Sequence, residues 1–269
     1  MGDELRGDSL VHLNVRFSTE AELKQTLDFL YVKSKEGISF TGLIEAMVNE
    51  VTIVTAIHNI KSNKGSKTAG IDQMKMDKYL QMPKEELIAL IRDNFSNYRP
   101  KPAKRVYIPK KNGKKRPLGI PTVLDRIIQE CVRIIIEPIC EARFYPHSYG
   151  FRPYRAQKHA VRDIINVINA STYSKDQLVW QVEGDIKGCF DHISHDWLLA
   201  NIPTDKVILK KWLKCGVIFK GELFKTEEGT MQGGIISPTL ANMTLDGIQP
   251  ILAQKYKRIC RKGSIILLW

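Results

Sequence analysis

The sequence has few cysteines, and none is spaced as a disulfide framework or a zinc site would require. Its 269 residues contain five Cys, at positions 131, 140, 189, 215 and 260, and no Cys-x-x-Cys motif. Because the number is odd, we interpret them as buried thiols in a reducing cytosol. Cys189, His192 and His195 stand three residues apart, but no fourth ligand lies near them, so we do not expect zinc.

Long apolar runs are also absent. Residues 1–16 carry scattered charges without an apolar core, which is unlike a signal peptide. No run approaches the length of a transmembrane helix, and the final apolar run, 265–269, has five residues and is typical of a core strand. We therefore expect no membrane association.

Acidic residues are scarce relative to basic ones. The chain has 41 Lys and Arg against 29 Asp and Glu, a net charge of +12 and a pI near 9.4. Such an excess favours a polyanionic partner, because Lys and Arg neutralise phosphates and release counterions. A basic soluble protein without such a partner remains the alternative. The length allows one large domain or two small ones.

Apolar spacing indicates helices with a few strands between them. Apolar residues at helical spacing predict helices over 18–61, after Pro83, near 158–168 and after Ser237-Pro238. Thr122 with Asp125 is typical of a helix cap. Alternation around turn-rich tips predicts hairpins at 105–120 and around 220–221. We therefore predict an α/β or α+β body.

One acidic position is distinctive in this basic chain. An apolar segment, 179–183, predicts a strand that runs into Asp185. A carboxylate at a strand tip suits a hard cation such as Mg²⁺, although a turn or capping Asp is the alternative. The basic loop 61–70 superficially resembles a phosphate-binding loop, but Ile71-Asp72 follows Gly70 where Lys-Ser/Thr is required.

Five segments in a fixed order resemble one family. They are Lys64-Gly-Ser-Lys-Thr-Ala-Gly-Ile-Asp72, Ile108-Pro-Lys110 with Lys115-Arg-Pro-Leu-Gly-Ile-Pro-Thr122, Ser148-Tyr-Gly-Phe-Arg-Pro153, Asp185-Ile-Lys-Gly-Cys-Phe-Asp-His-Ile193 and Gly229-Thr-Met-Gln-Gly-Gly-Ile-Ile-Ser-Pro238. Together they closely resemble group II intron-encoded reverse transcriptases, or maturases, over roughly residues 40–260. The resemblance implies right-hand polymerase fingers and palm: an amino-terminal helical extension (1–60), fingers (61–178) and a partial palm (179–269).

The resemblance also implies roles for particular residues. Asp185, helped by the Ile186 carbonyl, would hold catalytic Mg²⁺, and Phe190 would stack under the incoming sugar. Lys110 and Arg116 would grip the triphosphate, and Gln232 would lie beside the nascent base pair. Further nucleotide-pocket residues would be Tyr149, Gly150, Phe151 and Arg152, and template or intron RNA would contact Lys61, Lys64, Lys67, Lys104, Arg105, Arg155 and Lys158.

Each assignment has a structural alternative. Phe190 could be an ordinary core residue, Asp191 a supporting group, the basic hairpin a solvated face, and Gly233-Gly234 a simple turn.

The sequence departs from the family pattern in three places. Tyr154 stands where many relatives carry a small residue, and Met231 stands where Pro is common. The printed sequence has no Asp-Asp pair, so the Tyr-x-Asp-Asp hairpin that completes the family's metal site is missing. We therefore expect a fragment that does not polymerise alone, from a parent that copies RNA into DNA with dNTPs.

The expected partners are intron RNA and an RNA template with a DNA primer, in a bacterial cytoplasm. A homodimer through an exposed palm core is a further hypothesis. Two alternatives remain: an RNA-binding splicing module, or a retron or diversity-generating reverse transcriptase. The segment 64–72 argues against the latter.

Overall fold

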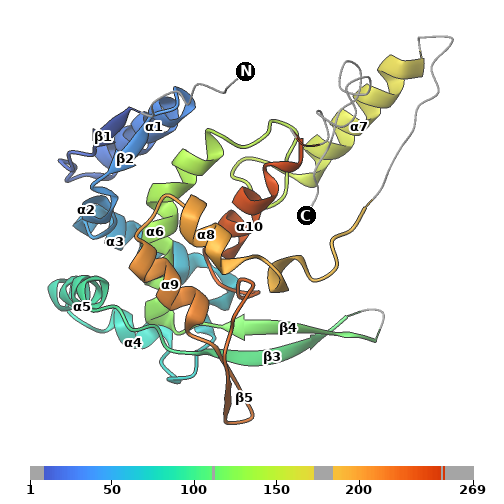
Figure 1. Ribbon diagram of the computed structural model, residues 1–269. Coiled ribbons are helices and arrows are strands. Elements are labelled where there is room, and N and C mark those ends of the chain that lie inside the picture. The colour runs from blue at the N-terminus through green and yellow to red at the C-terminus, as the bar shows by residue number, and fades with distance from the viewer. Residues whose placement is uncertain (1–8, 111–112, 173–183, 250, 252–269) are drawn as a thin grey trace.

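One long helix, α6 (Val123–Glu141), forms the centre of the molecule. The structure, a computed structural model, describes residues 9–110, 113–172, 184–249 and 251. Fourteen α6 residues are buried, because helices pack around it from several directions. The side chain of Thr122 caps its first turn by accepting a hydrogen bond from the Asp125 N–H, as the sequence predicted. Figure 1 shows α6 crossing behind the helices of the carboxyl-terminal half.

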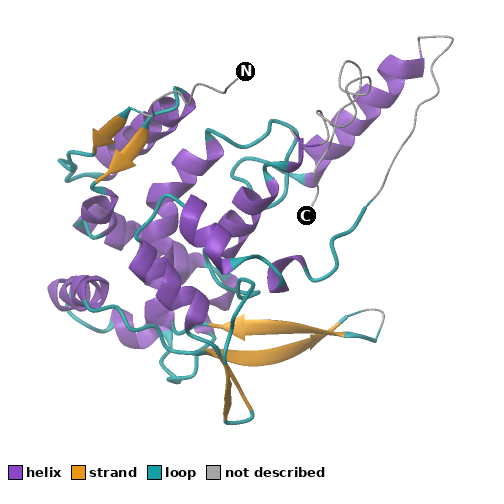
Figure 2. Ribbon diagram, in the orientation of Figure 1, coloured by secondary structure: helices purple, strands orange, loops and turns teal. Residues whose placement is uncertain are grey.

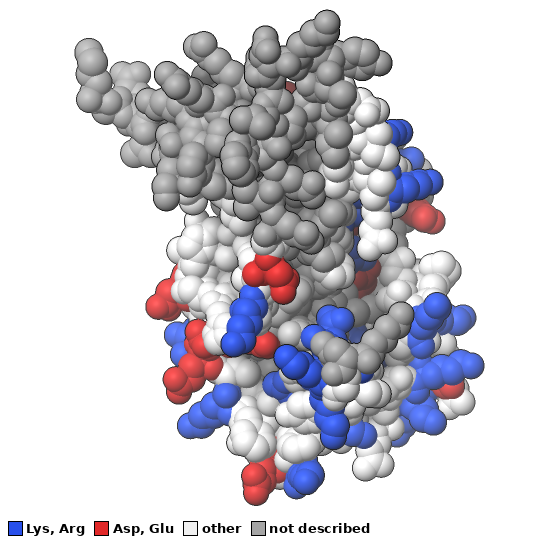
Figure 3. All heavy atoms as spheres, turned by 90° about the vertical axis from the view of Figure 1, so that its right-hand side faces the viewer, with Lys and Arg blue, Asp and Glu red and all other residues white. Residues whose placement is uncertain are grey.

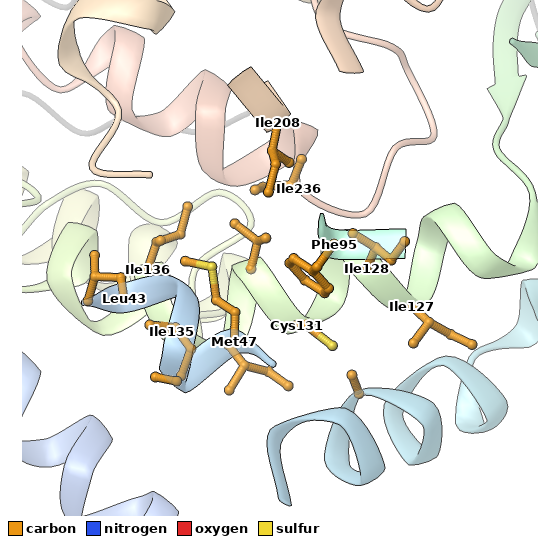
Figure 4. Packing of buried hydrophobic residues seen from close by; sticks show 14 of the residues in the cluster. Leu43, Met47, Phe95, Ile127, Ile128, Cys131, Ile135, Ile136, Ile208 and Ile236 are labelled. Carbon is orange, nitrogen blue, oxygen red and sulfur yellow. The ribbon is translucent and has the colours of Figure 1, made fainter. Parts of the chain in front are cut away.

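The hydrophobic core is built on both sides of α6. Figure 4 shows Leu43, Phe95, Cys131 and Ile208, from four different helices, meeting in one cluster. Each fully buried aliphatic side chain contributes about 1.5–3 kcal/mol relative to exposure, so this cluster sets the position of everything attached to α6.

The amino-terminal helices form as their spacing predicted. They are α1 (Glu20–Lys35), α2 (Leu43–Met47) and α3 (Glu50–Ser62), all packed on α6. A capping box of Thr19 and Glu22 begins α1. Two strands that the sequence did not predict, β1 (Leu10–His12) and β2 (Ser39–Thr41), pair in parallel beside α1. Each has three residues, too few to show alternation.

Residues 63–102 connect α3 to the strands. They contain the 3-10 helix η1 (Lys64–Lys67), α4 (Met76–Leu80) and α5 (Lys84–Ser96), the last directly after Pro83. A four-stranded sheet follows, ordered β4 (Lys115–Ile120), β3 (Ala103–Pro109), β5 (Val217–Phe219) and β6 (Glu222–Phe224). Figure 2 shows the β3–β4 pair extending away from the helices.

The sheet contains both predicted hairpins and one pairing that the sequence did not indicate. β3 with β4, and β5 with β6, are antiparallel, whereas β3 and β5 are parallel. The parallel pair joins segments more than a hundred residues apart, so no local pattern signals it. The mixture of helix and sheet confirms the predicted fold class.

The remaining elements are α7 (Gln157–Thr172), η2 (Cys189–Asp191), α8 (His195–Asn201), α9 (Lys206–Lys214) and α10 (Ser237–Leu245). The predicted strand 179–183 and the apolar run 265–269 lie outside the described residues, and residues 184–186 have no regular secondary structure. Within the described part of the chain, no helix is long and apolar enough to cross a membrane.

Four of the cysteines lie in the described residues, and none of these four is in a disulfide. Cys131 and Cys140 are buried, as predicted, and burial raises the pKa of the Cys140 thiol to about 12. Cys189 and Cys215 are only partly buried.

Candidate functional site

A cleft of about 280 Å³ lies where the base of the β3–β4 hairpin, the start of α6, η2 and the turn 229–234 meet. Its walls come from segments that are far apart in the sequence. They include Arg105, Gly119, Gln129, Phe190, Asp191, Met231 and Gln232. Arg105, which was predicted to contact RNA, therefore lines one cavity with Phe190 and Gln232, which were predicted to contact the nucleotide.

The glycine-rich turn 229–234 lies along the outer edge of β4. The Gly119 N–H donates to the Gln232 carbonyl at 2.7 Å. A Cβ on Gly119 would lie 2.7 Å from Met231 Sδ and closer still to its Cγ. Gly233 has a φ of 107°, and a Cβ there would lie 2.5 Å from the Gly119 carbonyl oxygen. Both glycines are required for this close approach, which goes beyond the simple turn left open by the sequence.

The turn also holds η2 in place. The Thr230 N–H donates to the Phe190 carbonyl, and the Gly229 N–H donates to the Ile193 carbonyl, each at 2.7 Å. A Cβ on Gly229 would lie 2.6 Å from the Asp191 carbonyl oxygen. Phe190 is partly buried and its ring meets the edge of Phe151, with centroids 6.4 Å apart. The aromatic side chain thus sits at the cleft with a second ring behind it.

Arg116 reaches this turn from the hairpin. Its Nε donates to Gln232 Oε1 at 3.1 Å. Arg116 pairs with Ile108 across the ladder, and the Lys110 N–H donates to the Lys114 carbonyl at 2.7 Å. Cross-strand partners share a face and side chains alternate along a strand, so Lys110 and Arg116 occupy the same face of the hairpin. Only Arg116 contacts the turn.

The loop 148–152 is held from within the protein. Arg152 is buried, and its Nε donates to both Glu141 carboxylate oxygens at 3.0 Å. The Tyr149 hydroxyl donates to Asp163, and this bond holds the pKa of the Asp163 carboxyl below its usual value. The Gly150 carbonyl accepts from Asn242 Nδ2 at 2.9 Å. Contact of these three residues with a nucleotide stays a prediction.

The residues predicted to bind RNA are mostly exposed. Lys61, Lys64, Lys67, Lys104 and Lys158 are all exposed, and Lys104 faces away from the side of β3 that carries Arg105. Arg155 differs, because its Nη1 donates to the Pro146 carbonyl at 2.8 Å and its guanidinium lies over the Tyr149 ring. Figure 3 shows Lys and Arg gathered on the lower half of the face towards which the hairpin projects.

Arg126 has a role that sequence reasoning missed. From the first turn of α6, its buried guanidinium donates to the carbonyls of Pro121 at 3.1 Å, Gly65 at 2.9 Å and Thr68. It therefore fixes the basic loop that contains η1 against the base of the hairpin. The sequence offers no distinct signal for this role, because α6 carries five other charged residues as well.

Two further α6 residues, Gln129 and Asp125, line the cleft. Gln129 Oε1 accepts from the Ile235 N–H at 2.9 Å and so ties α6 to the turn. Asp125 accepts from Thr122 Oγ1 at 2.6 Å and from the Tyr98 hydroxyl at 2.7 Å. Burial raises the pKa of Asp125, although both of these bonds oppose the shift.

The donors near Asp185 fit a hard divalent cation. Asp185 is exposed and Ile186 is 44% exposed, so the carboxylate and the following carbonyl are accessible. Desolvation raises the pKa of the Cys189 thiol, and the charges of Asp185 and Asp191 raise it further, which shows that both carboxylates lie near it. Among the described residues, no three His, Cys, Asp or Glu side chains form a group that could hold a metal ion.

Comparison with known proteins places this chain in a family. The family described as "Reverse transcriptase (RNA-dependent DNA polymerase)" matches residues 108–267, more than half of the chain. The protein therefore belongs to the reverse transcriptase family.

The chain is also similar to several individual proteins. The chain is 39% identical to the "Group II intron-encoded protein LtrA" of Lactococcus lactis subsp. cremoris, covering 88% of this chain and 40% of that protein. It is 36% identical to "Protein YkfC" of Escherichia coli (strain K12), covering 72% and 52%. It is 31% identical to the "Uncharacterized 91 kDa protein in cob intron" of Schizosaccharomyces pombe, covering 94% of this chain and 32% of that protein. The chain spans 40% of the length of the Lactococcus relative.

Proposed function

We propose that the parent of this chain polymerises DNA on an RNA template and binds its intron RNA to assist splicing and mobility. The observation that carries the proposal is the contact between Arg116 and Gln232 at a cleft that Phe190 also lines. A cation for phosphates, an amide for a base pair and an aromatic ring for a sugar converge there from three separate segments.

Different residues at the cleft would contact different parts of an incoming nucleotide. Lys110 and Arg116, on one hairpin face, would bind the triphosphate of an incoming nucleotide. Phe190, braced by Phe151, would contact its sugar, and Gln232 would contact its base pair. The fixed backbone of the turn holds these groups in position before the nucleotide arrives, which is the condition for precise orientation.

Asp185 and the Ile186 carbonyl would hold Mg²⁺ beside Phe190. When bound, the metal would stabilise the charge on the attacking and leaving oxygens of phosphoryl transfer. Because the printed sequence has no Asp-Asp pair, we propose that these 269 residues alone do not extend a primer. Robust Mg²⁺-dependent extension by this chain would show that proposal to be wrong.

RNA binding is the part of the function that this chain can perform without the complete metal site. The exposed lysines at 61, 64 and 67, on a loop held by Arg126, and Arg105 in the cleft support it. Because phosphate contacts release counterions, the affinity should fall steeply with salt.

Fluorescence anisotropy with a labelled single-stranded RNA tests this proposal on the chain itself. We expect Arg105→Gln with Arg116→Gln to weaken binding about tenfold at 0.1 M salt and to lower the salt slope by about one to two. Lys24→Gln with Lys78→Gln, exposed lysines on α1 and α4, is the charge-matched control. Asp185→Ala should retain RNA affinity while abolishing primer extension by the full-length parent. Salt-independent binding by the wild type would refute the proposal.

The bacterial cytoplasm and a homodimer stay proposals of lesser support. Sedimentation of the chain at high concentration tests the second, and a monomer throughout would argue against it.

A further inference from the structure

Helix α9 has a strongly basic outer face. Its buried side, Ile208, Leu209, Trp212 and Leu213, packs on the body of the protein. The intervening lysines, Lys210, Lys211 and Lys214, are exposed. Between residues 206 and 225 the chain has six Lys and a single acidic residue, Glu222. The helix begins at its cap Asp205 and contains no acidic residue.

These three lysines keep their charge unpaired within the described structure. Lys206, at the start of the helix, donates to the Ile202 carbonyl at 2.5 Å and is held there. No ion pair or hydrogen bond found among the described residues involves the side chain of Lys210, Lys211 or Lys214. Three neighbouring cations without a carboxylate partner form a surface that favours an anion.

The buried side and the end of α9 reach the cleft, whereas its exposed lysines lie on the other side of the helix. Trp212, Leu213 and Cys215, at the end of α9, line the cleft together with Arg105 and Lys225. The Ala103 N–H donates to the Gly216 carbonyl at 3.1 Å, which fixes the end of α9 to the start of β3. Figure 1 shows α9 beside the strands that carry the basic hairpin. An RNA strand that leaves the cleft around the end of α9 would reach these lysines next.

We propose that the outer face of α9 is a track for the phosphate backbone of a single-stranded RNA that extends out of the cleft. The nine residues of α9 span about 13 Å, the length of a few successive phosphates of an RNA strand. Lysine is suited to this role because it contacts phosphates as a point charge on a flexible stem. The proposal rests on the RNA-binding function proposed above and assigns it a second surface.

The test compares three proteins by RNA anisotropy over a range of salt concentrations. In the first, Lys210, Lys211 and Lys214 are all changed to Gln; in the second, the same three are changed to Arg. The third carries Lys24→Gln, Lys35→Gln and Lys78→Gln, which removes the same charge from exposed sites on α1 and α4. Circular dichroism melting of each protein monitors any loss of helix stability, because lysines near a helix carboxyl terminus also interact with its dipole.

For an RNA of about 12 nucleotides, the Gln triple variant should lose about tenfold in affinity at 0.1 M salt. Its salt slope should fall by about two, since single strands release roughly 0.7 counterions per phosphate contact. The Arg triple variant should bind like the wild type. An RNA of about four nucleotides is too short to span the cleft and α9 together, so the Gln triple variant should lose less affinity for it than for the longer RNA.

Three results would overturn the proposal. The first is equal RNA affinity of the Gln triple variant and its control. If Arg105→Gln with Arg116→Gln still lowered the RNA affinity in that case, the proposed function would stand without the α9 track. Another is a loss that appears equally with the short RNA. The third is the absence of salt-dependent RNA binding by the wild type, which would remove the proposed function as well.

Discussion

Gly119 allows the turn that carries Gln232 to lie against β4, so adding one methyl group there should separate them. In Gly119→Ala, the new Cβ would lie 2.7 Å from Met231 Sδ and closer to its Cγ. Met231 must move, and with it the Gln232 carbonyl that accepts the Gly119 N–H. Overpacking of this kind costs about 1–3 kcal/mol, whereas Ala gains about 0.5–1 kcal/mol over Gly in a strand. We expect a net loss of about 0.5–2 kcal/mol.

A double-mutant cycle isolates this collision from other effects. Met231→Ala removes the obstructing side chain, so in that background Gly119→Ala should be neutral or stabilising by up to about 1 kcal/mol. The coupling energy should therefore be about 1–3 kcal/mol, within the range for residues in direct contact. Urea denaturation of the four proteins, followed by tryptophan fluorescence, gives the free energies if the slopes of all four agree.

Gly119→Ala would have to lower the free energy of unfolding less with Met231→Ala than without it; an equal loss in both backgrounds, within about 0.5 kcal/mol, would contradict the collision. The methyl group would then act through the unfolded chain or through β4 itself, and Met231 would not determine the position of the turn.

Three other predictions follow from the same contacts. Arg126→Met should cost about 2–4 kcal/mol in urea denaturation and speed amide exchange across residues 64–68, because it removes the donor that the loop carbonyls share; unchanged exchange would contradict this. Tyr154 has a φ of 58°, a left-handed backbone conformation that strains a non-glycine residue, and its side chain is fully exposed. Tyr154→Gly should therefore raise the free energy of unfolding by about 0.5–1 kcal/mol, and a lower free energy of unfolding would show that the backbone there is not strained. Asp185→Asn should lower the pKa of Cys189 and so increase its thiolate fraction. Its alkylation at pH 8, followed by peptide mass spectrometry, should become faster, and an unchanged rate would place the carboxylate elsewhere.

Local patterns in the sequence predicted most of the helices and both hairpins. Caps begin the helices after Asn49 and Thr122, and alternating side chains mark the two strands of the β3–β4 hairpin. Both kinds of pattern lie within a few residues, so a sequence displays them directly. The strands β1 and β2 escaped prediction because three residues are too short for a period to show.

The candidate site was predicted less evenly. Arg105, Phe190 and Gln232 do line one cleft. Tyr149 and Arg152, within two residues of Phe151 in the sequence, instead direct their polar groups at Asp163 and Glu141. Their side chains could not be oriented from the motif, because the partner carboxylates lie on other helices.

By itself, the sequence determined the family, the basic charge and the order of the elements, since motifs and composition are properties of the chain alone. Only the tertiary structure decided that Arg116 meets Gln232, that Met231 lies over Gly119, and that Arg126 holds the basic loop. These contacts join segments 58 to 116 residues apart. They depend on how the helices pack around α6, which no local spacing can specify.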